Sequence, residues 1–240
     1  MRRLAAILAF IPAGFGASTL RADVATREWE FDGARLRVEL HAPSRSSADA
    51  VVLAHGFLRE PASLAGYARA IAADGRLALV PGMPSRVDSR ANGRALSALV
   101  ARLREGAFGH RVDRVVLVGF SAGGLSALLA AGSPGVAGYI GLDAFDRPSG
   151  TGLEAARALA VPVVLLHGAP AFCNAYNISA PWRAAVPRLE KDLRVEGAGH
   201  CDFEWPTDAG CTLACGAVHP AAQAVIRAEV RAALERLLPR

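Results

Sequence analysis

A serine within a glycine-rich turn is the residue of this sequence best placed to do chemistry. Residues 115–124 read Val-Val-Leu-Val-Gly-Phe-Ser-Ala-Gly-Gly, with Ser121 at the centre of a G-x-S-x-G pattern. An apolar β-branched run precedes the turn and a leucine- and alanine-rich segment follows it, which predicts strand, sharp turn and helix. Such a turn lifts the serine hydroxyl clear of the sheet, where it can act as a nucleophile.

A serine nucleophile needs a base that takes its proton and a carboxylate that orients the base. Three histidines follow Ser121 in the chain. We predict that His200 is the base, because it stands on a Gly-Ala-Gly loop just after the last predicted strand. His167 closes an earlier strand and His219 precedes a proline at a helix start, so we expect both to have structural roles.

The position of the acid follows from where carboxylates are missing. The loop after the predicted strand 161–166 holds none, although this is the commonest place for the acid. The preceding predicted strand, 136–142, ends directly at Asp143, and Asp146 comes one short turn later. We favour Asp143 as the acid and keep Asp146 as the alternative, since most loop aspartates cap turns or helices. Next in line are the two carboxylates beside the predicted base, Asp202 and Glu204.

Two backbone amides are expected to form the oxyanion hole. One is the amide of Ala122, which follows the nucleophile, and the other is the amide of Phe57 in the His-Gly-Phe loop after the predicted strand 51–54. His55 is expected to brace that loop by hydrogen bonds. A further set of large apolar side chains is expected either to line an apolar pocket or to pack in the core. They are Phe57, Leu58, Trp182, Phe203 and Trp205.

Strands and helices are predicted to alternate along most of the chain, which indicates a mostly parallel sheet with right-handed crossovers. In such sheets the chemistry gathers at the carboxyl ends of the strands. A hairpin is predicted over 28–40, with Asp32-Gly33 at its turn. Further strands are predicted over 51–54, 77–80, 115–118, 136–142, 161–166 and 192–196, and helices over 61–73, 89–104, 152–160, 182–188 and 221–238.

The first 22 residues have the pattern of a signal peptide. Two arginines precede an apolar run that is too short to span a bilayer, and small residues lead to a cleavage position after Ala22. We therefore predict a secreted or periplasmic protein whose catalytic domain covers residues 23–240. No later stretch is long and uninterrupted enough to predict a transmembrane helix, so we expect no stable membrane insertion.

Composition argues against several classes of partner. The 240 residues include 27 Lys and Arg against 22 Asp and Glu, and removal of the signal peptide lowers the net charge from +5 to +2. No arginine cluster interleaved with aromatic residues occurs, so we expect no nucleic-acid partner. The sequence contains no phosphate-binding glycine motif and no C-x-x-C metal pattern, so we expect neither a cofactor nor a metal. We also expect the protein to be a monomer.

All four cysteines lie in the last third of the chain, and an even number behind a signal peptide predicts two disulfides. The loops that carry Cys173 and Cys201 follow the last two predicted strands at the same sheet edge, which predicts a bond between them. Cys211–Cys215 then follows by exclusion, although a spacing of four residues needs a non-ideal helix to satisfy disulfide geometry.

The sequence resembles the α/β-hydrolases across the predicted mature region. The segments His-Gly-Phe at 55–57, Gly-Phe-Ser-Ala-Gly-Gly at 119–124, Gly-Leu-Asp at 141–143 and Gly-His-Cys-Asp-Phe at 199–203 are similar to the chlorophyllase and dienelactone-hydrolase-like branch. Secreted polyester hydrolases of the cutinase type share much of this layout. Chlorophyllases carry their acid in a similar Gly-x-Asp segment, which corresponds to Asp143.

Two departures limit that resemblance. Chlorophyllase-like turns carry His before the serine and Arg after it, where this chain has Phe120 and Ala122, and dienelactone enzymes use a cysteine where this chain has Ser121. Together with the predicted triad and signal peptide, the resemblance predicts a secreted serine esterase that acts on a small or polymeric ester. The alternatives are an acyltransferase or a peptidase with the same triad, and a binding protein that has kept the fold without catalysis.

Overall fold

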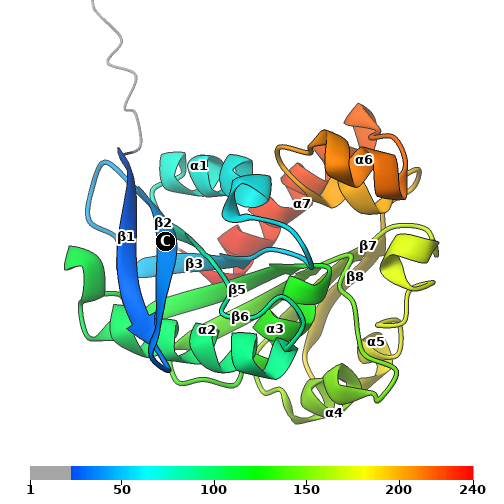
Figure 1. Ribbon diagram of the computed structural model, residues 1–240. Coiled ribbons are helices and arrows are strands. Elements are labelled where there is room, and N and C mark those ends of the chain that lie inside the picture. Colours follow the sequence, from blue (N-terminus) through cyan, green and yellow to red (C-terminus); the bar gives the residue numbers. More distant parts are fainter. Residues whose placement is uncertain (1–22, 240) are drawn as a thin grey trace, which may run out of the picture.

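Eight strands form one sheet in the computed structural model, which describes residues 23–239 (Figure 1). The predicted signal peptide, 1–22, lies outside the described residues. The strand order is β1-β2-β4-β3-β5-β6-β7-β8. Only the pairings β1–β2 and β2–β4 are antiparallel, so the sheet is mostly parallel, as predicted. The strands are β1 (Asp23–Phe31), β2 (Ala34–Ala42), β3 (Asp49–Ala54), β4 (Leu77–Pro81), β5 (Arg114–Phe120), β6 (Val136–Leu142), β7 (Val163–His167) and β8 (Leu189–Arg194).

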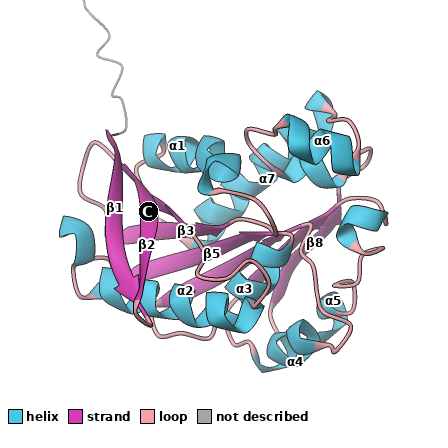
Figure 2. Cartoon of the chain, in the orientation of Figure 1, coloured by secondary structure: helices cyan, strands magenta, loops and turns pink. Residues whose placement is uncertain are grey.

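Helices cover both faces of this sheet (Figure 2). One face packs against α2, α3, α4 and α5, and the other against α1 and α7, so each face has its own apolar core. Central strands such as β3 and β5 are buried on both faces, which explains their continuous apolar sequences. The α-helices are α1 (Ala65–Ala73), α2 (Ser89–Arg104), α3 (Ala122–Ala130), α4 (Thr151–Ala158), α5 (Trp182–Ala185), α6 (Ala209–Cys215) and α7 (Pro220–Leu237), and the short 3-10 turns are η1 (Pro61–Leu64), η2 (Ala107–Gly109), η3 (Phe172–Asn174) and η4 (His200–Phe203).

The predicted hairpin is confirmed as β1 and β2. Phe31 pairs with Ala34 across a two-residue turn, and both turn residues, Asp32 and Gly33, have positive φ, at 49° and 73°. This is the backbone that tight hairpins need, and the Asp-Gly pair adopts it at low cost.

Two C-terminal elements differ from the prediction. The last strand was expected over 192–196 but occupies 189–194, because β8 is an edge strand with an exposed, charged sequence and its apolar pattern is weak. Helix α6 was not predicted, since its sequence Ala-Gly-Cys-Thr-Leu-Ala-Cys shows no apolar period. The side chain of Asp208 accepts a hydrogen bond from the Cys211 amide and caps this helix, which is the one local signal for it.

The disulfide prediction is wrong in its pairing. Cys173 bonds to Cys215 and Cys201 bonds to Cys211, with Cα–Cα distances of 5.7 and 5.8 Å. Cys211 and Cys215 are one turn apart on α6, where Cβ atoms are about 5–6 Å from each other, whereas a disulfide needs about 3.5–4.5 Å. Each therefore bonds to a different loop, and α6 joins the two loops.

The C-terminal helices were also compared with the requirements for a membrane span. Within residues 23–239, no single helix is both long enough and apolar enough to cross a bilayer. The pair α6 and α7 reaches those limits only when counted together, and it is bent by 110°. One face of α7 is buried against the sheet through Ile226, Val230 and Leu234.

Candidate active site

Ser121 stands at the tip of a strained turn between β5 and α3. Its φ of 53° and ψ of −124° lie outside the usual regions for a side-chain-bearing residue. Its backbone is held on both sides, because its amide donates to Leu142 O at 3.1 Å and its carbonyl accepts from the Phe145 amide at 2.9 Å. The predicted strand, turn and helix are therefore present, and the hydroxyl faces the carboxyl edge of the sheet.

Glycines make this turn possible by letting backbones approach closely. A Cβ on Gly119 would lie 2.5 Å from Gly123 O, and one on Gly124 would lie 2.6 Å from Ala144 Cβ. A Cβ on Gly123 would overlap the carbonyl oxygens of Ala54 and His55. The glycines are thus required by packing of β5, α3 and the end of β3, and not only by the turn itself.

The three side chains predicted for the triad meet at this edge. His200 Nε2 is 3.1 Å from Ser121 Oγ, and His200 Nδ1 is 2.6 Å from Asp143 Oδ2. A carboxylate only accepts hydrogen bonds, so Nδ1 carries the proton and Nε2 is free to accept from the serine hydroxyl. All three residues are at least nine-tenths buried, and the Phe120 ring packs on the imidazole with 4.7 Å between centroids.

Asp143 is fixed by a set of donors that sequence reasoning did not include. Its Oδ1 accepts from the Gly168 amide at 3.0 Å, and Asn174 Nδ2 lies 3.3 and 3.2 Å from its two oxygens. Asn174 is itself buried and also donates to Ala169 O at 2.8 Å. One signal for this role is present in the sequence: the loop after β7 holds no carboxylate, but it does hold Asn174 beside Cys173.

Asp146, the alternative acid, has a different set of partners. Its Oδ1 accepts from the Gly152 amide and its Oδ2 from the Leu153 amide at the start of α4, at 2.7 and 3.0 Å. Oδ2 also accepts from Trp182 Nε1 at 2.8 Å, and Trp182 is fully buried. Asp146 therefore caps a helix and anchors a core tryptophan, while the bond to His200 belongs to Asp143.

The predicted oxyanion donors belong to two segments that meet at the serine. Ala122 is the first residue of α3, and Phe57 follows Gly56, where an added Cβ would be 3.1 Å from Ser121 Cβ. Neither amide bonds to an acceptor within residues 23–239. A turn closed by the Arg59 amide and Gly56 O, at 3.2 Å, leaves the Phe57 amide unused. His55 braces this loop as predicted, with Nδ1 3.1 Å from Gly56 O, and burial lowers its pKa, which favours the neutral ring.

The loop that carries His200 is tied down by carboxylates on either side of it. Asp202, which is buried, accepts from the Gly199 amide at 2.8 Å and from Nδ1 of His219 at 2.9 Å. Glu204, also buried, accepts two hydrogen bonds from Arg59. These two carboxylates were the last alternatives for the acid, and their partners indicate support of the loop instead.

The large apolar side chains divide between core and surface. Trp182 and Phe203 are fully buried in the two cores, while Phe57 and Leu58 are 50% and 60% exposed beside Ser121. No single pocket therefore collects all of the residues named from the sequence. Two further exposed aromatic side chains stand on the loop that carries Asn174, and they are Phe172 and Tyr176.

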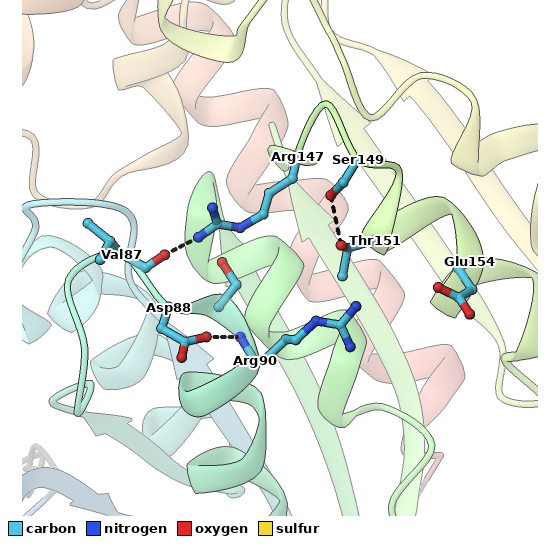
Figure 3. Close-up of a pocket in the computed structure, with 8 residues that line it drawn as sticks. Val87, Asp88, Arg90, Arg147, Ser149, Thr151 and Glu154 are labelled. Atoms are coloured by element: carbon cyan, nitrogen blue, oxygen red, sulfur yellow. Dashed lines mark hydrogen bonds between the residues drawn. The ribbon is translucent and has the colours of Figure 1, made fainter.

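A hollow of about 560 Å³ lies between the starts of α2 and α4 (Figure 3). Its lining is polar and includes two arginines and two carboxylates, so their formal charges cancel, and it contains none of the triad residues. Arg147 donates to Val87 O across the hollow, and Asp88 caps α2. The lining residues are Val87, Asp88, Ser89, Arg90, Arg147, Ser149, Thr151 and Glu154.

Three cysteine sulfurs are close enough to one another to suggest a metal site. Those of Cys201, Cys211 and Cys215 lie within 4.8 Å of one another. All three belong to disulfides, so none offers the thiolate that metal binding requires. The proximity instead reflects the two bonds that meet at α6.

No protein-family model matches this sequence, and no curated protein matches it. Solved structures match its fold. A structure titled "m3DLH" has a TM-score of 0.67 and 18% identity, covering 90% of this chain and 99% of that chain. A dienelactone hydrolase from Anabaena variabilis has a TM-score of 0.70 and 15% identity, covering 90% and 98%. Thermogutta terrifontis esterase 2, phosphonylated by sarin, has a TM-score of 0.63 and 15% identity, covering 97% and 100%.

These likenesses and the sheet topology define the fold. The chain has an α/β-hydrolase fold, with a mostly parallel eight-stranded sheet between two layers of helices. The identities are low, so the comparison concerns the fold, and the chemistry has to be argued from the site.

Proposed function

We propose that this protein is a serine hydrolase that cleaves carboxylic esters through an acyl-enzyme on Ser121. The observation that carries the proposal is the unbroken chain of hydrogen bonds from Ser121 Oγ through His200 to Asp143. A dienelactone hydrolase and an esterase among the proteins of similar fold support a hydrolytic reaction.

In the first half of the reaction, Ser121 Oγ attacks the ester carbonyl carbon while His200 Nε2 takes the hydroxyl proton. Asp143 keeps the proton on Nδ1 and stabilises the imidazolium that forms. The oxygen of the tetrahedral intermediate receives hydrogen bonds from the Phe57 and Ala122 amides. Each such donor is worth about 10²–10³ in kcat, because it is already oriented when the charge develops.

The first half ends when His200 gives its proton to the departing alcohol and the acyl group stays on Ser121 Oγ. In the second half, water attacks the acyl carbonyl carbon while His200 takes one of its protons. His200 then returns that proton to Ser121 Oγ as the intermediate collapses, which releases the carboxylic acid and restores the free serine. No metal or cofactor is needed for any of these steps.

The rim of the site supports an ester with apolar groups, either a small molecule or a polymer. Phe57 and Leu58, on the loop after β3, and Phe172 and Tyr176, on the loop that carries Asn174, expose between 50% and 83% of their surface. Exposed apolar side chains on loops at the carboxyl edge of the sheet, where Ser121 lies, offer contact area to an apolar substrate.

The decisive experiment is labelling with a fluorophosphonate probe together with hydrolysis of p-nitrophenyl esters of rising chain length. Ser121→Ala should abolish labelling and lower kcat by about 10⁵–10⁶. Ser126→Ala is the matched control, since Ser126 is a buried serine on α3, the helix that follows Ser121, and its hydroxyl donates to Ala122 O. Retained hydrolysis by a folded Ser121→Ala protein would overturn the serine mechanism.

We also propose that the protein acts as a monomer, secreted or periplasmic, after loss of residues 1–22. Two disulfides are consistent with such a compartment, because they persist under oxidising conditions. The N-terminal sequence of protein recovered from the periplasm or the medium tests the cleavage, which we expect before Asp23.

A further inference from the structure

Arg59 and Glu204 form an ion pair between two loops that both border Ser121. Arg59 Nε is 2.5 Å from Glu204 Oε1, and Arg59 Nη2 is 2.9 Å from Glu204 Oε2. The Glu204 side chain is fully buried and that of Arg59 is 16% exposed. This bidentate geometry is the strongest form of the pairing, and it orients both groups as well as attracting them.

On the first loop, the pair acts on the segment that offers the Phe57 amide. The two large side chains of this segment, Phe57 and Leu58, are mostly exposed, so apolar burial does little to hold it. Leu58 has a φ of 56°, a strained value that persists only where surrounding contacts impose it. Arg59, the next residue, supplies such a contact through its bond to the buried Glu204.

On the second loop, the pair acts on the segment that carries the base. Glu204 follows η4, which begins at His200, and its amide donates to Cys201 O at 3.3 Å. The same Arg59 reaches Asp208 Oδ2 at 2.8 Å, at the start of α6. Further along, the Trp205 backbone bonds to Ser63 and Gly66, so the two segments are also joined beyond the pair.

We propose that Arg59 and Glu204 are positioning residues that set the oxyanion amide of Phe57 relative to His200. The inference rests on the proposed ester hydrolysis and adds to it a coupling between the two halves of the site. Neither residue touches the reacting atoms, and the pair joins positions 145 residues apart. Because the oxyanion forms only in the transition state, the pair acts on kcat and leaves substrate binding nearly unchanged.

A second ion pair of the same kind provides the control. Arg114 Nε and Nη2 each lie 2.8 Å from an oxygen of Asp49, also in bidentate geometry. These residues are at the amino ends of β5 and β3, at the edge of the sheet opposite the site. Asp49→Asn therefore removes a similar pair without disturbing the loops that border Ser121.

Kinetics of Glu204→Gln with a p-nitrophenyl ester tests the inference. We expect kcat to fall about 10–100-fold, as for a misplacement on the order of 1 Å at an active site, with KM changed less than about 2-fold. Asp49→Asn should keep the wild-type kcat. Arg59→Lys keeps the charge but loses the fork, so it should give a smaller loss and serves if Glu204→Gln does not fold. A folded Glu204→Gln or Arg59→Lys with the wild-type kcat overturns the inference.

Amide hydrogen exchange separates this inference from the proposed function. Exchange of the Arg59 amide, which donates to Gly56 O, should rise at least about 10-fold in Glu204→Gln, and not in Asp49→Asn, because only the first frees the loop. This result does not depend on any ester being hydrolysed. Unchanged exchange in Glu204→Gln overturns the coupling between the two loops. If exchange is faster in Glu204→Gln but the wild-type protein hydrolyses no ester, the coupling is supported and the proposed function is overturned.

Discussion

The turn that carries Ser121 and the loop that carries His200 are held by different means. The turn is built from one continuous stretch, β5 and α3, and its glycines let the two elements touch the end of β3. The His200 loop follows the edge strand β8 and contains little regular structure. Contacts from distant parts of the chain hold it instead.

Those contacts come from four directions. Cys201 bonds to Cys211 on α6, Asp202 holds His219 at the start of α7, Glu204 holds Arg59, and His200 itself meets Asp143. The nucleophile therefore depends on local packing, whereas the base depends on cross-links from distant parts of the chain. Substitutions in the two regions should therefore affect activity and stability in different ways.

Among the changes that test this comparison, the largest effect is expected where the two regions meet. Asp143→Asn should lower kcat by about 10⁴ without unfolding the protein, because the imidazole loses the partner that fixes its tautomer and stabilises its charge. Kinetics at saturating ester and thermal melting of the same sample check this expectation.

Asp146→Asn is the matched variant for that experiment. It should lose about 1–3 kcal/mol of stability, since a cap of α4 and the bond to buried Trp182 are weakened, while the folded protein keeps its kcat. If Asp146→Asn were inactive and Asp143→Asn active, the assignment of the acid would be reversed.

Removal of the disulfides should destabilise the region around the loop that carries His200. Loop-closure entropy gives about 4 kcal/mol for Cys173–Cys215, which closes 42 residues, and about 3 kcal/mol for Cys201–Cys211, which closes 10. Paired Cys→Ser variants, followed by urea unfolding and kinetics, measure both. The second pair lies nearer to His200, so its loss should lower kcat more although it costs less stability.

Peptide mapping of the unreduced protein tests the pairing on which this prediction depends. It should recover peptides that join Cys173 to Cys215 and Cys201 to Cys211. Peptides that join Cys173 to Cys201 would contradict the structure and return to the pairing expected from the order of the strands.

Packing of the turn itself is tested by Gly123→Ala. The added methyl group would overlap the carbonyl oxygens of Ala54 and His55, which are backbone atoms and cannot rotate away. We expect a loss of about 3 kcal/mol, the upper end for an overpacked site, seen as a lower denaturation midpoint. Gly132→Ala is the control, because a Cβ there meets nothing within 4 Å. Equal stability of the two variants would show that close approach does not shape the turn.

The smallest effect concerns pH. Burial raises the pKa of Glu204 above its ordinary value of 4.5, against the opposing effect of Arg59. Between the ordinary pKa and the raised one, the folded protein binds more protons than the unfolded chain, so its stability falls as pH rises through that window. The free energy of unfolding of the wild type minus that of Glu204→Gln should therefore decrease with pH there and level off above it. A difference that grows with pH in that window would contradict the sign.

Much of the site could be predicted because local patterns and one topological rule suffice for it. The turn at Ser121 has its apolar strand, its glycines and its helix within sixteen consecutive residues. Parallel strands end at one edge of the sheet, so Asp143 after β6 and the loop after β8 had to approach the end of β5. Those two facts predict Ser121 and His200, and they favour Asp143 as the acid while leaving Asp146 as the alternative.

What the tertiary structure alone decided depends on pairs of residues far apart in the chain. Asn174 meets Asp143 over 31 positions, Cys173 meets Cys215 over 42, and Arg59 meets Glu204 over 145. No period or spacing in the sequence marks such pairs, because each depends on how separate loops pack once the sheet has formed. The order of strands places the loops at one edge, and only their packing selects which side chains bond across it.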